Sequence, residues 1–140
     1  MMVNFADFKE NARIEKDGKY KFTIDNAELT LNSKGNPQVI FQLVADEGTI
    51  RLYIQLQQNL LWKYNKLIGA ALNLKKGQKF EYDPETIHNQ LIGKQFIGEV
   101  KSREYAKEEK VEQDGLFTTQ TVTKIAYDVT AFYPVDTDIE

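Results

Sequence analysis

Residues 18–56 alternate between apolar and polar side chains, and this alternation restricts the fold more than any other feature of the chain. The segment reads GKYKFTIDNAELTLNSKGNPQVIFQLVADEGTIRLYIQL, with turn-forming residues at 32–37 and 46–48. Alternation with a period of two residues places one set of side chains on the buried face of a sheet and the other set on the solvent-exposed face. The pattern therefore predicts three antiparallel strands joined by hairpins.

The first and third runs divide their side chains between the two faces. We expect the core to receive Tyr20, Phe22, Ile24, Ile50, Leu52, Ile54 and Leu56, and solvent to receive Lys19, Lys21, Thr23, Thr49, Arg51, Tyr53 and Gln55. Asn26 interrupts the first run, which predicts a bulge or bend there. The nearly continuous apolar run 39–44 predicts a central strand covered on both sides.

Size and composition exclude several classes of protein. A chain of 140 residues is one domain and can bury a core without covalent staples. It has no cysteine, which excludes disulfides and thiolate chemistry. No apolar run approaches the ~20 residues of a membrane span, and the first ten residues lack the order of a signal peptide. We expect a cytoplasmic protein that does not contact a membrane.

The net charge of −3 conceals an uneven distribution along the chain. Residues 16–110 carry fifteen cations and twelve anions, whereas residues 111–140 carry one cation and six anions. Local patches rather than the total decide whether a protein binds a polyanion. The body is therefore mildly basic, which is also compatible with an ordinary solvated surface.

Helical periodicity replaces the alternation after residue 56. Apolar residues recur at helical spacing over 59–72, with Lys63 and Lys66 on the wet side. Asp83 followed by Pro84 predicts the start of a second, short helix that ends near Gly93.

The last part of the chain returns to extended structure. Residues 95–100 predict a fourth strand, and 121–133 predict a fifth that Pro134 ends. The charged segment 102–115 between them predicts a long, mobile loop at a hairpin tip.

The order of these elements predicts a mainly β protein, a five-stranded OB-fold barrel. A helical insert would lie between strands 3 and 4, and a long loop between strands 4 and 5. Residues 1–134 would form one domain, with 1–16 as an N-terminal arm and 135–140 as an acidic C-terminal tail.

Three short motifs carry a family resemblance over residues 16–134. They are Gly18-x-Tyr20, Lys34-Gly35-Asn36-Pro37 and Leu91-Ile92-Gly93-Lys94-x-Phe96-x-Gly98. The chain resembles the small OB-fold single-stranded-DNA-binding proteins encoded by phages and prophages of Gram-positive bacteria. The resemblance implies an early protein of phage DNA replication or recombination in the cytoplasm of an infected or lysogenic host. The end VDTDIE is similar to the acidic tails that recruit replication enzymes, but it lacks a terminal Pro-Phe.

Single-strand binding requires cations along a groove and flat rings on which bases stack. We expect Arg51, Tyr53, Lys101 and Arg103 to make the central contacts, with Lys19, Lys21 and Tyr105 at the margins. The alternative interpretation is that these are solvating cations and tyrosines that pack on the sheet.

Catalysis finds little support in the sequence. His88 has no obvious partner, and the order Asp83…Glu99-x-Lys101, which some Mg²⁺-dependent nucleases use, is better explained by Asp83 as a helix cap. We therefore expect no enzyme, no metal and no cofactor. The rival function is a protein–protein docking module built on the same barrel. Trp62 and exposed strand edges would also allow a homo-oligomer.

Overall fold

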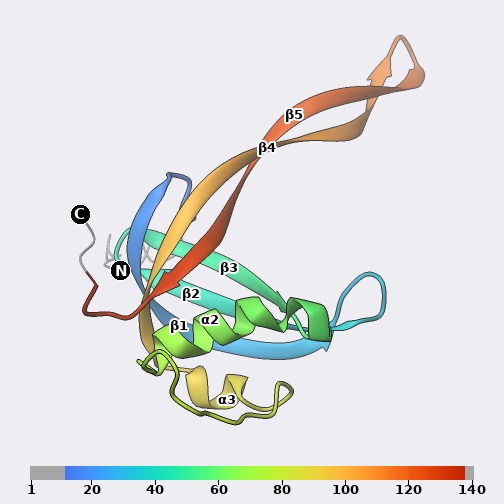
Figure 1. Ribbon diagram of the computed structural model, residues 1–140. Helices are drawn as coiled ribbons and strands as arrows, with labels where there is room; N and C mark the ends of the chain where they lie inside the picture. The colour runs from blue at the N-terminus through green and yellow to red at the C-terminus, as the bar shows by residue number, and fades with distance from the viewer. Residues whose placement is uncertain (1–11, 138–140) are drawn as a thin grey trace, which may run out of the picture.

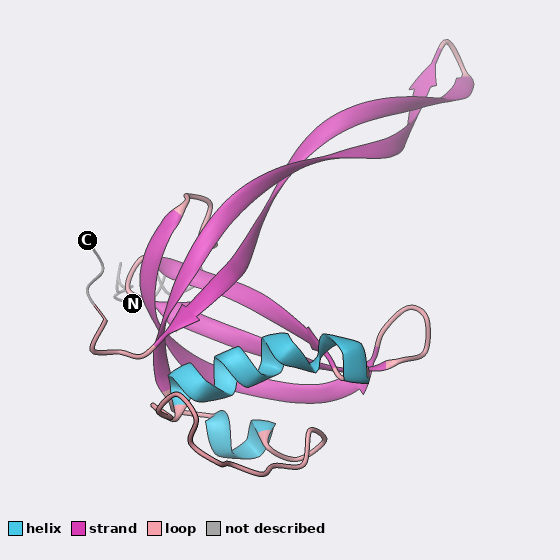
Figure 2. Cartoon of the chain, in the orientation of Figure 1, coloured by secondary structure: helices cyan, strands magenta, loops and turns pink. Residues whose placement is uncertain are grey.

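The protein is a five-stranded antiparallel sheet with two short helices, described here over residues 12–137 of a computed structural model (Figures 1 and 2). The elements in chain order are β1 (Gly18–Leu31), β2 (Pro37–Ala45), β3 (Gly48–Gln55), the 3₁₀ turn η1 (Gln58–Leu60), α2 (Leu61–Ala71), α3 (His88–Leu91), β4 (Gln95–Gln113) and β5 (Leu116–Tyr133). The prediction of a mainly β chain is confirmed.

β1 lies at the centre of the sheet, whose strand order is β3-β2-β1-β4-β5. Its first half pairs with β4, from Gly18 to Thr23, and its second half pairs with β2, from Thr23 to Leu31. The register with β2 shifts between Ile24 and Asn26, so the predicted bulge is present. An extra residue at a bulge bends a strand and increases its twist, which lets one strand serve both halves of a curved sheet.

The core fills one side of this curved sheet. Alternate residues of β1, β2 and β3 point into it, as the sequence predicted for Tyr20, Phe22 and Ile24. Neighbouring rings of Tyr20, Phe22, Phe96 and Phe132 have centroids 5.7–5.8 Å apart along this side. α2 covers the core with its buried side chains, which include Tyr64, Leu67 and Ile68.

Two local predictions need correction. The run 39–44 is fully covered on one side only, because Ile40, Gln42 and Val44 are half-buried on the outer face. The second helix spans only His88–Leu91, shorter than the predicted 83–93. Asp83 instead caps the turn before it, where its Oδ1 accepts a hydrogen bond of 2.9 Å from the Glu85 backbone N–H.

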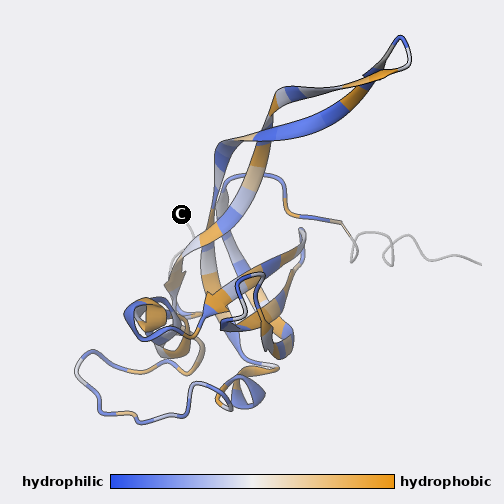
Figure 3. Cartoon of the chain, turned by 90° about the vertical axis from the view of Figure 1, so that its right-hand side faces the viewer, coloured by the Kyte–Doolittle hydropathy of each residue, from blue (hydrophilic) through white to orange (hydrophobic). Residues whose placement is uncertain are grey.

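The predicted long loop between the fourth and fifth strands is wrong. β4 continues to Gln113 and β5 begins at Leu116, so only Asp114 and Gly115 connect them. Both turn residues have positive φ, 53° and 81°, as a two-residue hairpin turn requires. The strands project from the body as a long two-stranded ribbon, defined here as residues 101–128 (Figures 1 and 3). Because solvent reaches both faces of this ribbon, its residues do not show the alternation that marks a half-buried strand.

The two ends of the chain are only partly described. Residues 1–11 of the predicted arm and 138–140 of the predicted acidic tail lie outside the described residues. Pro134 begins a turn closed by a 3.0 Å hydrogen bond from the Thr137 N–H. Within residues 12–137, no helix has the length and apolar content needed to cross a bilayer.

Gly98 provides a test of core packing. An added Cβ there would lie 2.8 Å from two carbons of the Phe22 ring and 3.1 Å from Phe96. Overpacking of this kind typically costs about 1–3 kcal/mol. We expect Gly98→Ala to lower the free energy of unfolding in urea by this amount.

Gly69→Ala in α2 is the matched control, because nothing lies within 4 Å of a Cβ at that position. Replacing a helical glycine by alanine should stabilise the protein by about 0.8–1 kcal/mol. Equal effects of the two substitutions would contradict the packing around Phe22.

The buried Tyr64 should make the free energy of unfolding fall at alkaline pH. Its hydroxyl is buried and has no hydrogen-bond partner among residues 12–137, and burial raises the pKa of this phenol well above its usual range. The stabilisation linked to this raised pKa is complete below about pH 10 and is lost as the pH rises further. Tyr64→Phe should therefore raise the free energy of unfolding at pH 7 by about 1 kcal/mol and weaken its decline above pH 10.

Tyr82→Phe serves as the comparison in the same urea titrations. The Tyr82 hydroxyl donates a hydrogen bond to Asn65, so its removal should destabilise the protein at pH 7 by about 1 kcal/mol. If both phenylalanine variants were destabilised alike, the hydroxyl of Tyr64 would have a partner.

Candidate nucleic-acid interface

A groove lies between β3 and β5, the two edge strands of the sheet. Its volume is about 750 Å³, within the range of about 300–1,000 Å³ that ligand sites occupy. Its lining combines rings, cations and a few apolar side chains. The main members are Arg13, Arg51, Tyr53, Tyr105, Ile125 and Tyr127.

The β3 side of the groove presents Arg51 and Tyr53. Both lie on the outer face of the strand, as the alternation predicted, and Tyr53 is 47% exposed. Tyr53 pairs across the sheet with the half-buried Ile40, which provides an apolar neighbour for its ring. Arg51 Nε donates a weak hydrogen bond of 3.4 Å to Gln42 Oε1, so its charge faces solvent without a carboxylate partner among residues 12–137.

The N-terminal arm adds a cation that the sequence did not indicate. Residues 12–14 run parallel to the start of β3, with hydrogen bonds from Ile14 N to Thr49 O (2.9 Å) and from Thr49 N to Ala12 O (2.7 Å). Ile14 is buried in the core and anchors the arm. Arg13 therefore lies at the groove, although no sequence pattern linked it to Arg51.

The ribbon side of the groove presents two further tyrosines. Tyr105 of β4 is 39% exposed, and Tyr127 of β5 packs partly against the core. Arg103 lies over the Tyr105 ring, 5.5 Å from its centroid, and its Nε is 2.6 Å from Asp128 Oδ2. This ion pair is exposed and contributes at most about 1 kcal/mol to the free energy of unfolding. Its main effect is that Asp128 neutralises the charge of Arg103.

Three of the seven predicted binding residues line the groove: Arg51, Tyr53 and Tyr105. Lys19, Lys21, Lys101 and Arg103 do not line it. Lys19 and Lys21 were expected at the margins of the site around Arg51, but β2 separates β1 from β3, and both lysines lie on the half of β1 that pairs with β4.

Lys19 also has a neighbour of its own. Its ammonium lies 4.9 Å from the centroid of the Tyr133 ring. Lys101 pairs across the ribbon with Asp128, the carboxylate that also contacts Arg103. The cations outside the groove are therefore partly matched by rings and carboxylates.

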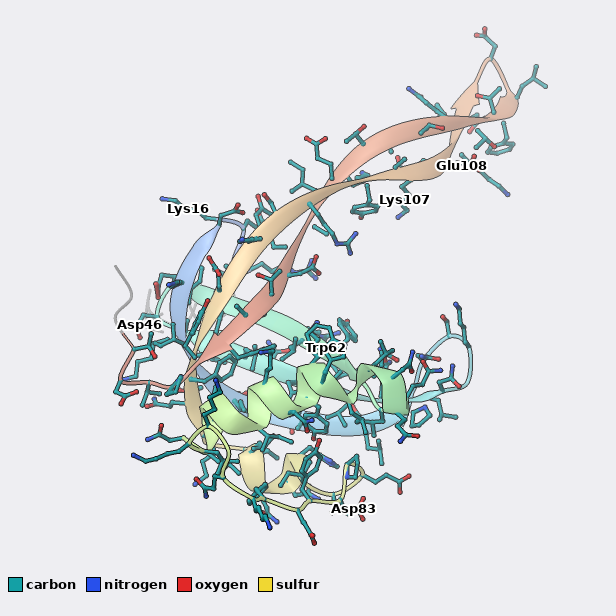
Figure 4. The ribbon with its side chains drawn as sticks, viewed as in Figure 1. Lys16, Asp46, Trp62, Asp83, Lys107 and Glu108 are labelled. Carbon is teal, nitrogen blue, oxygen red and sulfur yellow. The ribbon has the colours of Figure 1, made fainter. Side chains whose placement is uncertain are left out.

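Three further residues lie on the helices α2 and α3, namely Trp62, Lys63 and His88. Trp62 is 59% exposed and projects from α2 on the side opposite α3 (Figure 4). The neighbouring Lys63 was expected on the wet side but is half-buried, and burial lowers its pKa while the nearby Asp128 opposes this effect. His88 is buried, and no cluster of three or more metal-ligating side chains occurs within residues 12–137.

Comparisons with known proteins add no family assignment. No protein-family model matches the sequence, and no curated protein matches it.

Substitution of Gly48 tests how residues 12–14 of the arm are held against β3. Its φ is 150°, and an added Cβ would lie 2.5 Å from the Ala12 carbonyl oxygen, which is rigid backbone. We expect Gly48→Ala to displace residues 12–14 and to lower the free energy of unfolding by about 1–3 kcal/mol. Faster hydrogen exchange at the Ile14 and Thr49 amides would report the displacement.

Gly35→Ala is the control for backbone strain without collision. Gly35 has a φ of 81°, and nothing lies within 4 Å of a Cβ there. This variant should lose about 1–2 kcal/mol and leave exchange at Thr49 unchanged. Unchanged exchange in Gly48→Ala as well would contradict the position of the arm.

Proposed function

We propose that the chain is an OB-type barrel that binds single-stranded DNA, without sequence preference, in the groove between β3 and β5. The strand order supports the fold, because a barrel of this kind opened between β3 and β5 gives the order β3-β2-β1-β4-β5. α2 and α3 would be its helical insert, since they lie between β3 and β4 in the chain. The hairpin ribbon would take the place of the expected long loop.

The single observation that carries the proposal is the combination of three tyrosines and two arginines around one groove. Stacking of a base on an aromatic ring contributes about 1–3 kcal/mol and tolerates any base. Tyr53 and Tyr105 are the rings best suited to stacking, because both are partly exposed. Arg13 and Arg51 supply charge for the phosphates between stacked bases.

The groove is only weakly positive, which predicts the character of binding. Glu15 also lines it and offsets part of the charge of Arg13 and Arg51. Neutralising two phosphates of a single strand gives a slope of log K against log salt of about −1.4. We therefore propose that ring stacking supplies most of the affinity and that salt weakens it only moderately.

The biological setting is proposed from the resemblance described above. A phage or prophage replication or recombination module requires a protein that covers transient single strands. Binding without sequence preference is suited to that task, because the covered sequence changes as the strands are exposed.

A double substitution tests the site. Arg51→Ala combined with Tyr53→Ala should weaken binding of oligo-dT by about 10–100-fold, from the loss of one stacked base and one phosphate contact. Tyrosine and tryptophan fluorescence during titration at two salt concentrations measures both the affinity and the slope. Both side chains face solvent, so the thermal midpoint should not change.

The matched control is Lys19→Ala with Lys21→Ala, which removes two cations from the same sheet but outside the groove. It should change the affinity less than threefold. Equal losses of affinity in the two double variants would indicate that DNA binds a general basic surface and not the groove. Without saturable binding at low salt, the alternative of a protein–protein docking module would replace this proposal.

A further inference from the structure

We propose that two copies of this chain associate through the outer edge of β5, so that their ribbons form one four-stranded antiparallel sheet. Residues 117–125 of each copy would pair about a two-fold axis at Thr121. This inference does not depend on the proposed DNA binding, because it is argued from the exposed edge and the charges of the ribbon, although Ile125 also lines the groove.

The ribbon lacks a third strand. β1 pairs with β4 only as far as Val100, so residues 101–113 and 116–128 pair only with each other within the described chain. An isolated two-stranded hairpin is at best marginally stable in water. The ribbon projects well beyond the body, which leaves both of its long edges accessible to another strand (Figures 1 and 3).

The two edges of the ribbon differ in charge. The β4 edge carries eight charged residues between 101 and 112, whereas residues 116–123 of β5 read LFTTQTVT and carry none. Charges such as Lys107 and Glu108 protect an exposed edge from pairing with other chains (Figure 4). The β5 edge has neither charge nor proline over these eight residues, so it is the edge available for strand addition.

The same charges identify a second copy as the occupant. Pairing about a two-fold axis sets a segment against itself in reverse. On the β4 edge the even-numbered residues direct N–H and C=O outward, so they would pair with one another. An axis at Glu108 would then oppose Glu108 to itself and Glu104 to Glu112. An axis at Lys110 would oppose Lys110 to itself and Glu108 to Glu112. On the β5 edge, threonines would oppose threonines, which is a favourable cross-strand pair. Self-association is therefore opposed at one edge and compatible with the other.

The hairpin turn fixes which β5 residues offer hydrogen bonds to a partner. In a two-residue turn the flanking pair, here Gln113 and Leu116, exchanges hydrogen bonds, and this pattern alternates along the ribbon. Odd-numbered residues of β5 from Phe117 onward therefore direct N–H and C=O toward the outer edge. A self-pairing centred on the odd-numbered Thr121 uses these outward groups throughout.

This register also covers the most exposed apolar side chains of the ribbon. With the axis at Thr121, Phe117 lies opposite the partner subunit's Ile125, and Leu116 lies opposite the partner subunit's Ala126. Phe117 and Leu116 are 73% and 70% exposed in the single chain, and Ile125 is 57% exposed. Registers shifted by two residues in either direction would oppose Leu116 to a charged residue, Lys124 or Asp128.

Cysteine substitution tests both the interface and its register, because the chain has no cysteine of its own. Residues directly opposite on antiparallel strands have Cα atoms about 5.5 Å apart, within disulfide range. Thr121→Cys should form a covalent dimer on mild oxidation, and an equimolar mixture of Phe117→Cys and Ile125→Cys should form a mixed disulfide. Ala106→Cys, at the β4 edge of the same ribbon, should remain a monomer. Equal crosslinking of Thr121→Cys and Ala106→Cys would overturn the proposal.

Solution mass provides a second, independent readout. Light scattering should give the wild-type chain about twice its monomer mass of 16.2 kDa. Thr119→Lys with Thr123→Lys should give the monomer mass, because the paired lysines oppose each other across the axis, and so should Thr119→Glu with Thr123→Glu. An equimolar mixture of the two variants should recover the dimer. A wild-type monomer at tens of micromolar, or a dimer that both charge variants retain, would overturn the proposal.

Discussion

The change of partner within β1 is the constraint on which the rest of the structure depends. The strand pairs with β4 from Gly18 to Thr23 and with β2 from Thr23 to Leu31, and its bulge lies between Ile24 and Asn26. This arrangement makes β1 the centre of the sheet and leaves β3 and β5 as its edges. The bulge bends β1, and side chains from both edge strands line the groove. The close approach of Gly98 to Phe22 belongs to the same arrangement, since tight contact between β1 and β4 leaves no room for a side chain there.

The candidate site combines segments that are distant along the chain. The arm contributes Arg13, β3 contributes Arg51 and Tyr53, and the ribbon contributes Tyr105 and Tyr127. None of these segments would form a binding surface alone, because each supplies at most two of the required side chains. Rings from opposite sides of the groove face a shared space, which is the geometry that stacking of successive bases requires. In the proposed DNA complex, the weak net charge of the groove would make these rings more important than the cations.

The ribbon contributes both to the candidate binding groove and to the proposed dimer interface. Its base helps to line the groove through Tyr105 and Ile125, and its outer part exposes an uncharged strand edge. A partner paired along that edge would bring its Phe117 to Ile125, at the border of the groove. Assembly and ligand binding would then meet at Ile125 and Ala126, so the dimeric state would influence access to the groove from the ribbon side.

The sequence by itself determined the strands whose two faces differ and the side chains that each face receives. Tyr20, Phe22 and Ile24 alternate because one face of β1 is dry, and the interruption at Asn26 marked the bulge. The ribbon gave no such signal, since both of its faces are wet, although the Asp114-Gly115 pair was a readable hairpin turn. Only the tertiary structure decided which distant segments meet. Burial leaves a local pattern in the chain, whereas the approach of Arg13 to Arg51 and the separation of Lys19 from both depend on strand order, which no local pattern records.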